Sequence, residues 1–241
     1  FSSVYSIFSL LHLNFINLVC FPLSIFGLID DIWHIKPFWR YLAQFFTCSL
    51  IVLIKMKFSL ALPVFLVLVI IGTAFINFTN FMDGIDGLVG GCIIIILCTV
   101  NILQYQNSSI ALISSLIMFL IFNWHPSKLF MGDSGSTFLG AILFGSLLQI
   151  NSFYNLIGIL LVSSPLFGDA CLCVIRRLIA GKNIFSAHRS HLYQRLQRSG
   201  FKHSNVSLLY IFLTLIISIT YLIYGLKFTI LVFLINLIIL V

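Results

Sequence analysis

Long apolar stretches separated by short polar loops dominate this sequence. Nine such runs can be read at 4–29, 39–54, 59–78, 88–103, 109–124, 135–150, 153–175, 206–224 and 226–241. Most contain about 16–25 residues, near the roughly 20 that a helix needs to cross a bilayer. No repeat of 20–50 residues accompanies them. The pattern predicts an all-α, polytopic membrane helical bundle with about nine transmembrane helices, forming one domain over residues 1–241.

Composition excludes a soluble domain. The chain is 61% hydrophobic and 8% charged, with 25 phenylalanines, and its mean hydropathy is +1.15. Only the segment 176–205 is long enough to form a substantial polar loop. The chain opens at Phe1, already within an apolar run and without a recognisable signal peptide. We therefore expect further N-terminal sequence with one or two additional helices.

Basic residues fall mainly on one side of the predicted membrane. If each run crosses once, the loops 30–38, 79–87, 125–134 and 176–205 share a face. Ten basic residues belong to that face: Lys36, Arg40, Lys128, Arg176, Arg177, Lys182, Arg189, Arg195, Arg198 and Lys202. The positive-inside rule makes it cytoplasmic, with 176–205 as a basic cytoplasmic loop. The net charge of +7 then reflects topology and anionic headgroups, and no nucleic-acid partner is expected.

All acidic residues are aspartates, and they lie at segment ends on that same face. They are Asp30, Asp31, Asp83, Asp86, Asp133 and Asp169. A carboxylate inside an apolar run would cost about 2.5–3.5 kcal/mol at a membrane helix centre. Their gathering near the membrane surface suggests a metal ion and phosphate chemistry. The six cysteines lie in apolar runs without zinc spacing, which predicts reduced core residues.

The first polar loop carries Asp30 and Asp31 after an apolar run. Adjacent helical residues point about 100° apart, so the pair cannot chelate one ion symmetrically. We expect one of them to face a site and the other a basic partner or a second ligand. A plain polar helix end is the alternative, although the macrodipole disfavours acids at a helix C-terminus.

The second polar loop repeats a polar side chain every three residues, at Asn77, Asn80, Asp83 and Asp86. On a continuing helix this spacing makes one polar stripe. Interspersed glycines would allow a ligand or another backbone to approach closely. A simple turn is the alternative, but a turn does not require four polar groups in phase.

The third polar loop runs from Asn123 to Thr137. Pro126 breaks the incoming helix. Three residues could each N-cap the outgoing helix: Asp133, Ser134 and Ser136. A functional interpretation joins Lys128 for phosphate and Asp133 for Mg²⁺, with Phe130 stacking on a flat ring. His125 alone is weak support for a ligand site.

The fourth loop contains His188 and His191 at a spacing that can share a helical face, with Arg189 and Arg195 nearby. We favour anion binding, because the arginines would repel a divalent cation at the histidine pair. A basic loop that only obeys topology would explain the arginines but not the histidines.

These loops, in this order, resemble the polyprenyl-phosphate N-acetylhexosamine-1-phosphate transferases of glycosyltransferase family 4. The resemblance rests on Asp30-Asp31, NFTNFMDGIDGL at 77–88 and PSKLFMGDSGS at 126–136, and it runs from about Gly27 to Arg195. It implies a family architecture of ten to eleven helices. It also implies a multi-pass protein of the bacterial inner membrane with its active site facing the cytoplasm, and, by analogy, a homodimer.

The implied reaction is attack by the phosphate of undecaprenyl phosphate on the β-phosphate of a UDP-N-acetylhexosamine, releasing UMP. The resemblance makes Asp133 the Mg²⁺ ligand, with Mn²⁺ as a substitute, and Asp30, beside Asp31, the residue that deprotonates or orients the carrier phosphate. The implied nucleotide and metal-side positions are Asn80, Asp83 and Asp86, and Phe130 lies near the uracil. Lys128 is the motif lysine, and His191 opens the family's His-x-His-His signature. Asn77, in the same polar stripe, is expected to bind substrate.

The signature departs from the family pattern, because it continues as Leu192-Tyr193-Gln194 and lacks the two later histidines. The acidic residue often found three positions before it is His188. Such a departure resembles the branch that uses UDP-linked 6-deoxy-N-acetylhexosamines in O-antigen assembly, and it argues against the muramoyl-pentapeptide substrate. The competing hypothesis is a transporter or ion channel, since membrane-edge aspartates also line cation pathways. That class predicts polar groups near mid-membrane and internal repeats, and neither is evident.

Overall fold

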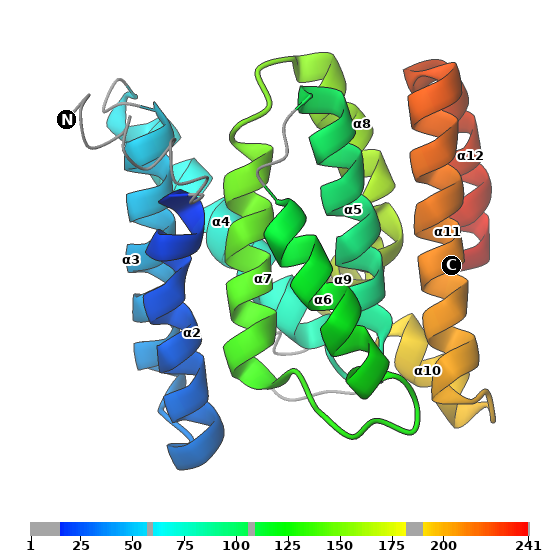
Figure 1. Cartoon of the computed structure of the whole chain (residues 1–241), viewed down its shortest axis with the longest axis horizontal. Coiled ribbons are helices and arrows are strands. Elements are labelled where there is room, and N and C mark those ends of the chain that lie inside the picture. The colour runs from blue at the N-terminus through cyan, green and yellow to red at the C-terminus, as the bar shows by residue number, and fades with distance from the viewer. Residues whose placement is uncertain (1–14, 57–59, 106–108, 182–189, 241) are drawn as a thin grey trace.

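The computed structural model describes residues 15–56, 60–105, 109–181 and 190–240, and every regular element within them is a helix (Figure 1). The elements are α2 (Phe15–Trp33), α3 (Pro37–Met56), α4 (Leu62–Met82), α5 (Leu88–Gln104), α6 (Ile110–Asn123), α7 (Gly132–Leu147), α8 (Phe153–Val162), α9 (Ser164–Ile179), α10 (Leu192–Arg198), α11 (His203–Tyr224) and α12 (Leu226–Leu240). The predicted all-α membrane bundle is confirmed.

Each predicted apolar run is occupied by helix, but the runs do not all become full-length spans. Four helices are long and apolar enough to cross a membrane, namely α2, α3, α4 and α11. A fifth span arises if α8 and α9 are counted together, and α5, α6 and α12 are shorter apolar helices. Part of the first predicted run, residues 4–14, lies outside the described residues.

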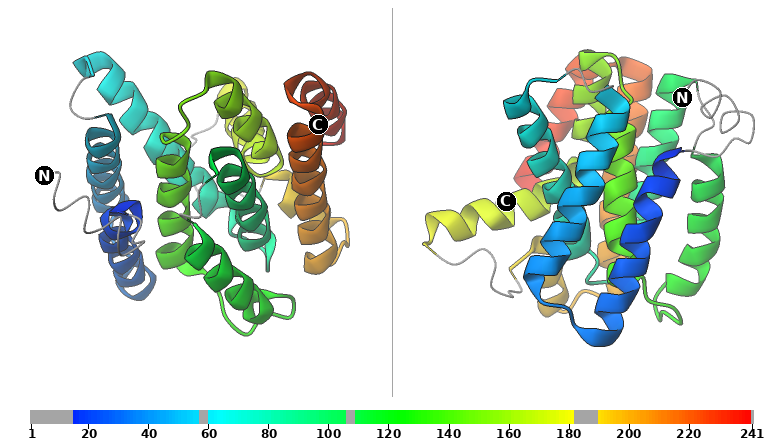
Figure 2. Two further views of the ribbon diagram at one scale, coloured as in Figure 1. Left: turned by 45° about the horizontal axis from the view of Figure 1, so that its top comes forward. Right: turned by 90° about the vertical axis from the view of Figure 1, so that its left-hand side faces the viewer.

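The predicted run 153–175 is not one continuous helix. This run divides into α8 and α9, whose axes differ by 76°. Pro165 stands in the first turn of α9, where a missing amide hydrogen costs no helical bond, so a new helix begins there readily. Figure 2 shows the consequence, because α9 leaves the bundle sideways before the chain returns to α10.

Helix α7 is the element about which the bundle is organised. It packs most extensively against α2 and α4. Leu139 and Leu143 belong to a core shared with α5, α8, α9 and α11, whereas Ile142 and Phe144 belong to a second core shared with α2, α3 and α4. Because opposite faces of α7 are buried in different cores, the position of its N-terminus is fixed from both sides.

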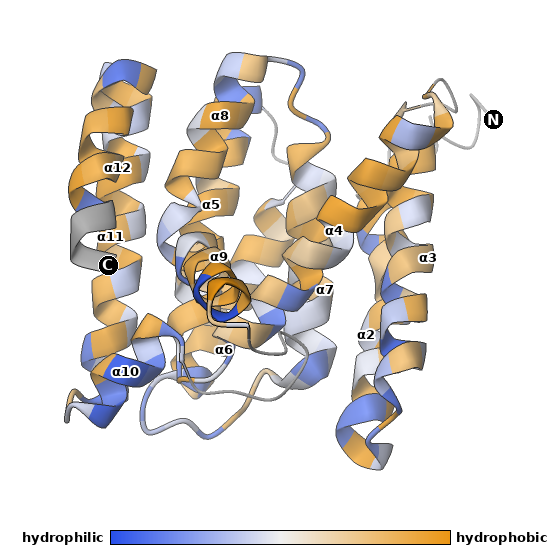
Figure 3. Ribbon diagram, turned by 180° about the vertical axis from the view of Figure 1, so that it is seen from behind, coloured by the Kyte–Doolittle hydropathy of each residue, from blue (hydrophilic) through white to orange (hydrophobic). Residues whose placement is uncertain are grey.

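Polar residues concentrate at one end of the bundle. In Figure 3 the helix middles are mostly hydrophobic, while α10 and, on the opposite side of the bundle, the lower end of α2 are strongly hydrophilic. The ends of α2 and α4 meet the start of α7 here through Asp31, Asn80 and Asp133. The loops after α4 and α6 meet the start of α11 through Asp86, His125 and His203. The described parts of the four predicted polar loops therefore include residues that meet at one end of the bundle.

We predict that Gly140→Ala destabilises the bundle. A Cβ at Gly140 would lie 2.7 Å from the backbone Cα of Ile76, and backbone cannot yield as a flexible side chain does. Overpacking of this kind typically costs about 1–3 kcal/mol. Thermal unfolding in detergent should show a lowered midpoint. Gly168→Ala is the matched control, since no atom lies within 4 Å of its added Cβ; equal midpoints for the two variants would contradict the close α4–α7 contact.

Candidate active site at the polar end of the bundle

A cavity of about 310 Å³ opens at the polar end, where segments distant in the sequence meet. Its lining consists of Asp31, Asn80, Asp83, Gly84, Ile85, Asp86, Asn123, Phe130, Met131, Gly132, Asp133 and His203. Four of the six aspartates of the chain are thus gathered around one hollow, together with two carboxamides and the predicted ring-stacking residue Phe130, which is 74% exposed.

Asp133 is held from two sides. Its Oδ1 accepts a hydrogen bond of 2.6 Å from Nδ2 of Asn80, and its Oδ2 forms an ion pair of 2.7 Å with Nη2 of Arg40. Asn80 also donates to the Ser136 hydroxyl at 3.0 Å. The carboxylate therefore has a fixed orientation at the first turn of α7.

Arg40 joins two acids of the site. Its Nε lies 2.8 Å from Oδ2 of Asp30 while Nη2 contacts Asp133. Asp30 is only 5% exposed, and its Oδ1 accepts a hydrogen bond of 2.8 Å from the Ile35 amide. Of the two adjacent acids, Asp30 is therefore the one with a basic partner, as the sequence allowed.

Asp31 faces the cavity and also caps α7. Its two oxygens accept hydrogen bonds from the amides of Asp133 at 3.0 Å and Ser134 at 3.3 Å. These are amides that a helix N-terminus leaves without an intrahelical partner. Gly132 has φ +63°, and a Cβ there would lie 2.6 Å from Oδ2 of Asp31. The expected N-caps Asp133, Ser134 and Ser136 were wrong, because the N-cap is Met131 and a carboxylate from α2 serves its amides.

Asp83 follows the end of α4, and its surroundings penalise ionisation. The predicted continuous polar stripe was wrong: α4 ends at Met82, Asp83 is its C-cap, and a turn leads to Gly87 with φ +77°. Burial raises the pKa of Asp83 to about 7, and the negative charges of Asp133, Asp31 and Asp86 act in the same direction. A cation in the cavity would relieve this repulsion.

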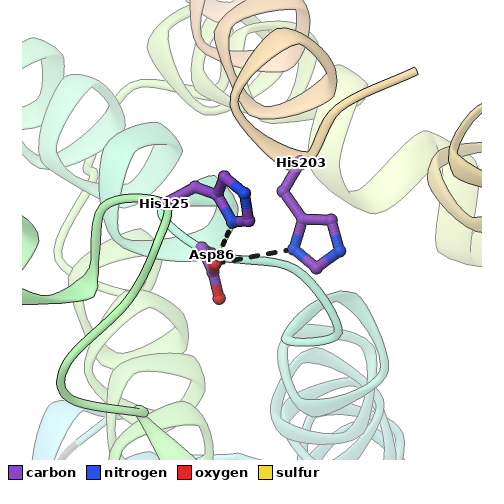
Figure 4. Close-up of side chains that lie close together, drawn as sticks. All are labelled: Asp86, His125 and His203. Carbon is purple, nitrogen blue, oxygen red and sulfur yellow. Dashed lines mark hydrogen bonds and ion pairs between the residues drawn. The ribbon is translucent and has the colours of Figure 1, made fainter.

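Asp86 is surrounded by donors from two other segments. His125 Nδ1 lies 2.8 Å from its Oδ2, the Ser127 hydroxyl donates to Oδ1 at 2.9 Å, and His203 Nδ1 is 3.5 Å away (Figure 4). Burial alone would raise the pKa of Asp86, but the hydrogen bonds from His125 and Ser127 and the nearby His203 leave it below its ordinary value. The surroundings of Asp86 therefore favour its ionised form, whereas those of Asp83 favour the neutral form.

His191 lies beside the cavity rather than in its lining. It is 2% exposed at the N-cap of α10, and its ring stacks on that of Tyr193 with centroids 5.7 Å apart. The Tyr193 hydroxyl donates to the carbonyl of Phe81 at 3.0 Å. The fourth loop thus contacts the end of α4 directly.

Not every predicted site residue reaches the cavity. Asn77 instead bonds Gln44, with its Nδ2 2.7 Å from Oε1, and Lys128 and Arg195 are exposed residues outside the lining. His188 and Arg189 lie outside the described residues. Of the predicted histidine–arginine cluster, His191 and Arg195 belong to the described residues.

The structure adds site residues that the sequence did not single out. In the sequence, the positive-inside rule alone accounts for Arg40, and Asn123 marks only the start of a polar loop. Yet the Asn123 side chain accepts from the Gly87 amide at 2.9 Å and donates to the Leu129 carbonyl at 2.8 Å, fixing two loops. An asparagine just before a helix-breaking proline was the available signal for it; His203 offered none.

The chain matches the model of "Glycosyl transferase family 4" over residues 13–151. It is 30% identical over 224 residues to a probable undecaprenyl-phosphate N-acetylglucosaminyl 1-phosphate transferase of Bacillus subtilis, covering 82% of this chain and 62% of that protein. It is 30% identical to a decaprenyl-phosphate N-acetylglucosaminephosphotransferase of Mycobacterium leprae, covering 76% and 57%.

A third relative is the phospho-N-acetylmuramoyl-pentapeptide-transferase of Carboxydothermus hydrogenoformans, 32% identical over 61% of this chain and 47% of that protein. The chain therefore spans about half to three fifths of the length of these curated relatives.

We predict that Asp83 makes the metal-free protein less stable as the pH rises. The folded-state pKa of about 7 exceeds the ordinary 3.8, so the folded state retains a proton that the unfolded chain has released. The contribution of Asp83 to the free energy of unfolding is then greatest below about pH 4 and is lost progressively up to about pH 7, by at most about 4 kcal/mol. In chelator, Asp83→Asn should show a smaller decrease in melting temperature between pH 5 and pH 8 than the unsubstituted protein. Parallel curves would exclude this assignment.

Proposed function

The chain belongs to glycosyl transferase family 4, and on this premise we propose that it transfers an N-acetylhexosamine 1-phosphate from a UDP-sugar to a polyprenyl phosphate. The products are a polyprenyl-diphospho-sugar and UMP. The observation that carries the proposal is the convergence of Asp31, Asp83, Asp86 and Asp133 on one cavity at the polar end of a membrane bundle. The printed activities of the relatives support the same reaction class.

The residues present fit Mg²⁺. The cavity offers carboxylate and carboxamide oxygens, which are the ligands this cation prefers. The raised pKa of Asp83 reflects burial and unbalanced negative charge, which a divalent cation would offset. Asp133 and Asp83 are the residues that would hold it, with Asn80 fixing the orientation of Asp133. When bound, the ion would supply charge neutralisation for the diphosphate and for departing UMP.

Phosphoryl transfer requires alignment and charge balance more than covalent participation by the protein. Phe130, exposed at the cavity wall, would stack on the uracil, and Asp86 lies at the same wall. Asp30 would orient the carrier phosphate. Because Arg40 and the Ile35 amide already engage the Asp30 carboxylate, this residue is better suited to fixing geometry than to moving freely as a base.

We propose a 6-deoxy-N-acetylhexosamine as the sugar and undecaprenyl phosphate as the carrier, in the first membrane step of O-antigen or a related envelope polysaccharide. The support is local to the signature at 191–194. Tyr193 stands where the family has a histidine, is 1% exposed, and packs so closely on Gly84 that no Cβ would fit there. A buried phenol beside the acidic turn offers a less polar environment than an imidazole does.

The distribution of basic residues indicates how the bundle is oriented in the membrane. The polar end would face the cytoplasm of a bacterial inner membrane, because the loops at that end carry most of the lysines and arginines. This placement gives the cavity access to soluble UDP-sugars and, at the membrane edge, to the phosphate of the lipid carrier.

We expect Asp133→Asn to abolish transfer at every pH. The substitution removes the charge that both Arg40 and a metal would engage. Purified protein in detergent, with undecaprenyl phosphate and radiolabelled UDP-GlcNAc, UDP-GalNAc and their 6-deoxy forms, should give Mg²⁺-dependent lipid product and UMP only with the unsubstituted chain. Gly168→Ala is the control for expression and folding. An active Asp133→Asn protein would remove Asp133 as the metal ligand.

Asp30→Asn distinguishes orientation from base catalysis. The second pKa of a phosphate monoester is near 6, so the carrier is largely a dianion at neutral pH and gains little from a base. Misplacement alone can cost on the order of 100-fold in rate. We expect a similar loss at all pH values from 6 to 8.5, measured as initial rates at saturating donor. Activity retained above pH 8 but lost near pH 6 would establish the base role instead.

A further inference from the structure

Two imidazoles and one carboxylate meet at the wall of the cavity, and each comes from a different segment. Asp86 belongs to the turn after α4, His125 to the loop after α6, and His203 is the first residue of α11. Figure 4 shows both rings directed at the Asp86 carboxylate. One ligand atom from each residue lies within 4.8 Å of the other two.

The distances from the Asp86 carboxylate to the two imidazoles are close to those of a tetrahedral transition-metal site. Zinc binds imidazole nitrogen and carboxylate oxygen at about 2.0–2.2 Å, which places neighbouring tetrahedral ligands roughly 3.3 Å apart. The Nδ1 atoms of His125 and His203 lie 2.8 Å and 3.5 Å from Oδ2 of Asp86, on either side of that value. Small rotations of the two rings, whose centroids are 4.9 Å apart, would complete the geometry.

His203 is held in a way that suits a ligand. Its Nε2 contacts the Gln197 side chain of α10, while its buried Nδ1 has no hydrogen-bond partner and faces the carboxylate. The Gln197 atom at this contact is the amide nitrogen, a donor; with the amide turned so that its Oε1 faces the ring, it would accept the Nε2–H of a histidine that binds metal through Nδ1. On the other side, the Ser127 hydroxyl donates to Oδ1 of Asp86 and leaves Oδ2 toward the imidazoles.

The cluster is accessible enough to exchange an ion. The side chains of His125 and His203 are 39% and 29% exposed, and that of Asp86 is 11% exposed. Asp86 and His203 both line the cavity, which leaves a direction open for a fourth ligand such as water. Catalytic and inhibitory zinc sites share this feature of three protein ligands and one open position.

We propose that Asp86, His125 and His203 bind a divalent transition metal of the zinc class, at a site separate from the oxygen ligands around Asp133. Imidazole suits zinc, copper and nickel, whereas carboxylates and water suit magnesium. The two sites therefore select different ions. Metal at the imidazole site engages Asp86 and withholds it from the nucleotide end of the cavity, so zinc inhibits transfer; this consequence alone rests on the proposed function.

Cobalt is a visible probe for such a site, because tetrahedral Co²⁺ with imidazole ligands absorbs in the visible range. The full chain, purified in detergent and stripped with chelator, is titrated with Co²⁺ in excess Mg²⁺. We expect absorption bands that Zn²⁺ removes and further Mg²⁺ does not. His125→Gln and His203→Gln should each weaken Co²⁺ binding by about tenfold or more.

His34→Asn is the matched control. It removes an exposed imidazole from the same end of the bundle, and asparagine tolerates the φ of +50° found there. Variants are compared only as monodisperse fractions with an unchanged melting temperature. Because His125 and His203 lie in different segments, each variant tests the site independently. Equal Co²⁺ affinity in both variants and the control, or displacement by Mg²⁺ as readily as by Zn²⁺, overturns the proposal. A chain without transferase activity that still binds Co²⁺ through these histidines would refute the proposed function alone.

Discussion

The paired ion contacts of Arg40 are the interaction on which the polar end depends. Helices α2 and α7 bring Asp30 and Asp133 together, and like charges at such proximity would otherwise disfavour that packing. One guanidinium, through Nε at 2.8 Å and Nη2 at 2.7 Å, compensates both. The planar fork of arginine suits two acceptors at once, which a lysine ammonium does not reproduce. Asp30 is only 5% exposed, so without Arg40 its charge would remain uncompensated at a buried position. The role proposed for these acids therefore depends on the compensation that Arg40 supplies.

A further carboxylate, that of Asp169, fixes the start of α10 beside the site but does not line the cavity. Asp169 on α9 is 3% exposed and accepts hydrogen bonds from the amides of Leu192 and Tyr193 and from the Tyr210 hydroxyl, at 2.8, 3.2 and 2.7 Å. These bonds attach the start of α10 to the bundle. Tyr193 then reaches the Phe81 carbonyl. The bend between α8 and α9, which the apolar pattern did not reveal, is what carries Asp169 to this point. The position of the acidic turn thus depends on a helix that leaves the bundle.

The helices could be predicted from the sequence because burial in lipid requires apolar runs of defined length, and such runs are visible without knowledge of the fold. The turn after Met82 was only the alternative for a specific reason: the three-residue spacing from Asn77 to Asp86 continues through it, so helix and turn look alike in sequence. Arg40 was missed because the positive-inside rule already accounted for a basic residue there. His203 was missed because its partner, Asp86, is remote in sequence and only the packing of α11 against α5 brings them together. Convergence of the aspartates was predictable, but the groups that hold them were not.

The cavity is chemically asymmetric, and this follows from where each acid stands. The α7 side presents carboxylate oxygens and the guanidinium of Arg40. Burial and the neighbouring negative charges raise the pKa of Asp83 there and favour its neutral form. At the Asp86 side, imidazoles and a hydroxyl stabilise the anion. A divalent cation with a diphosphate would suit the α7 side, because the cation would offset the mutual repulsion of the carboxylates there. A neutral base ring requires only directional hydrogen bonds, which an anchored anion such as Asp86 provides. Under the proposed function, the diphosphate with its cation would lie at the α7 side of the cavity and the uracil at the Asp86 side.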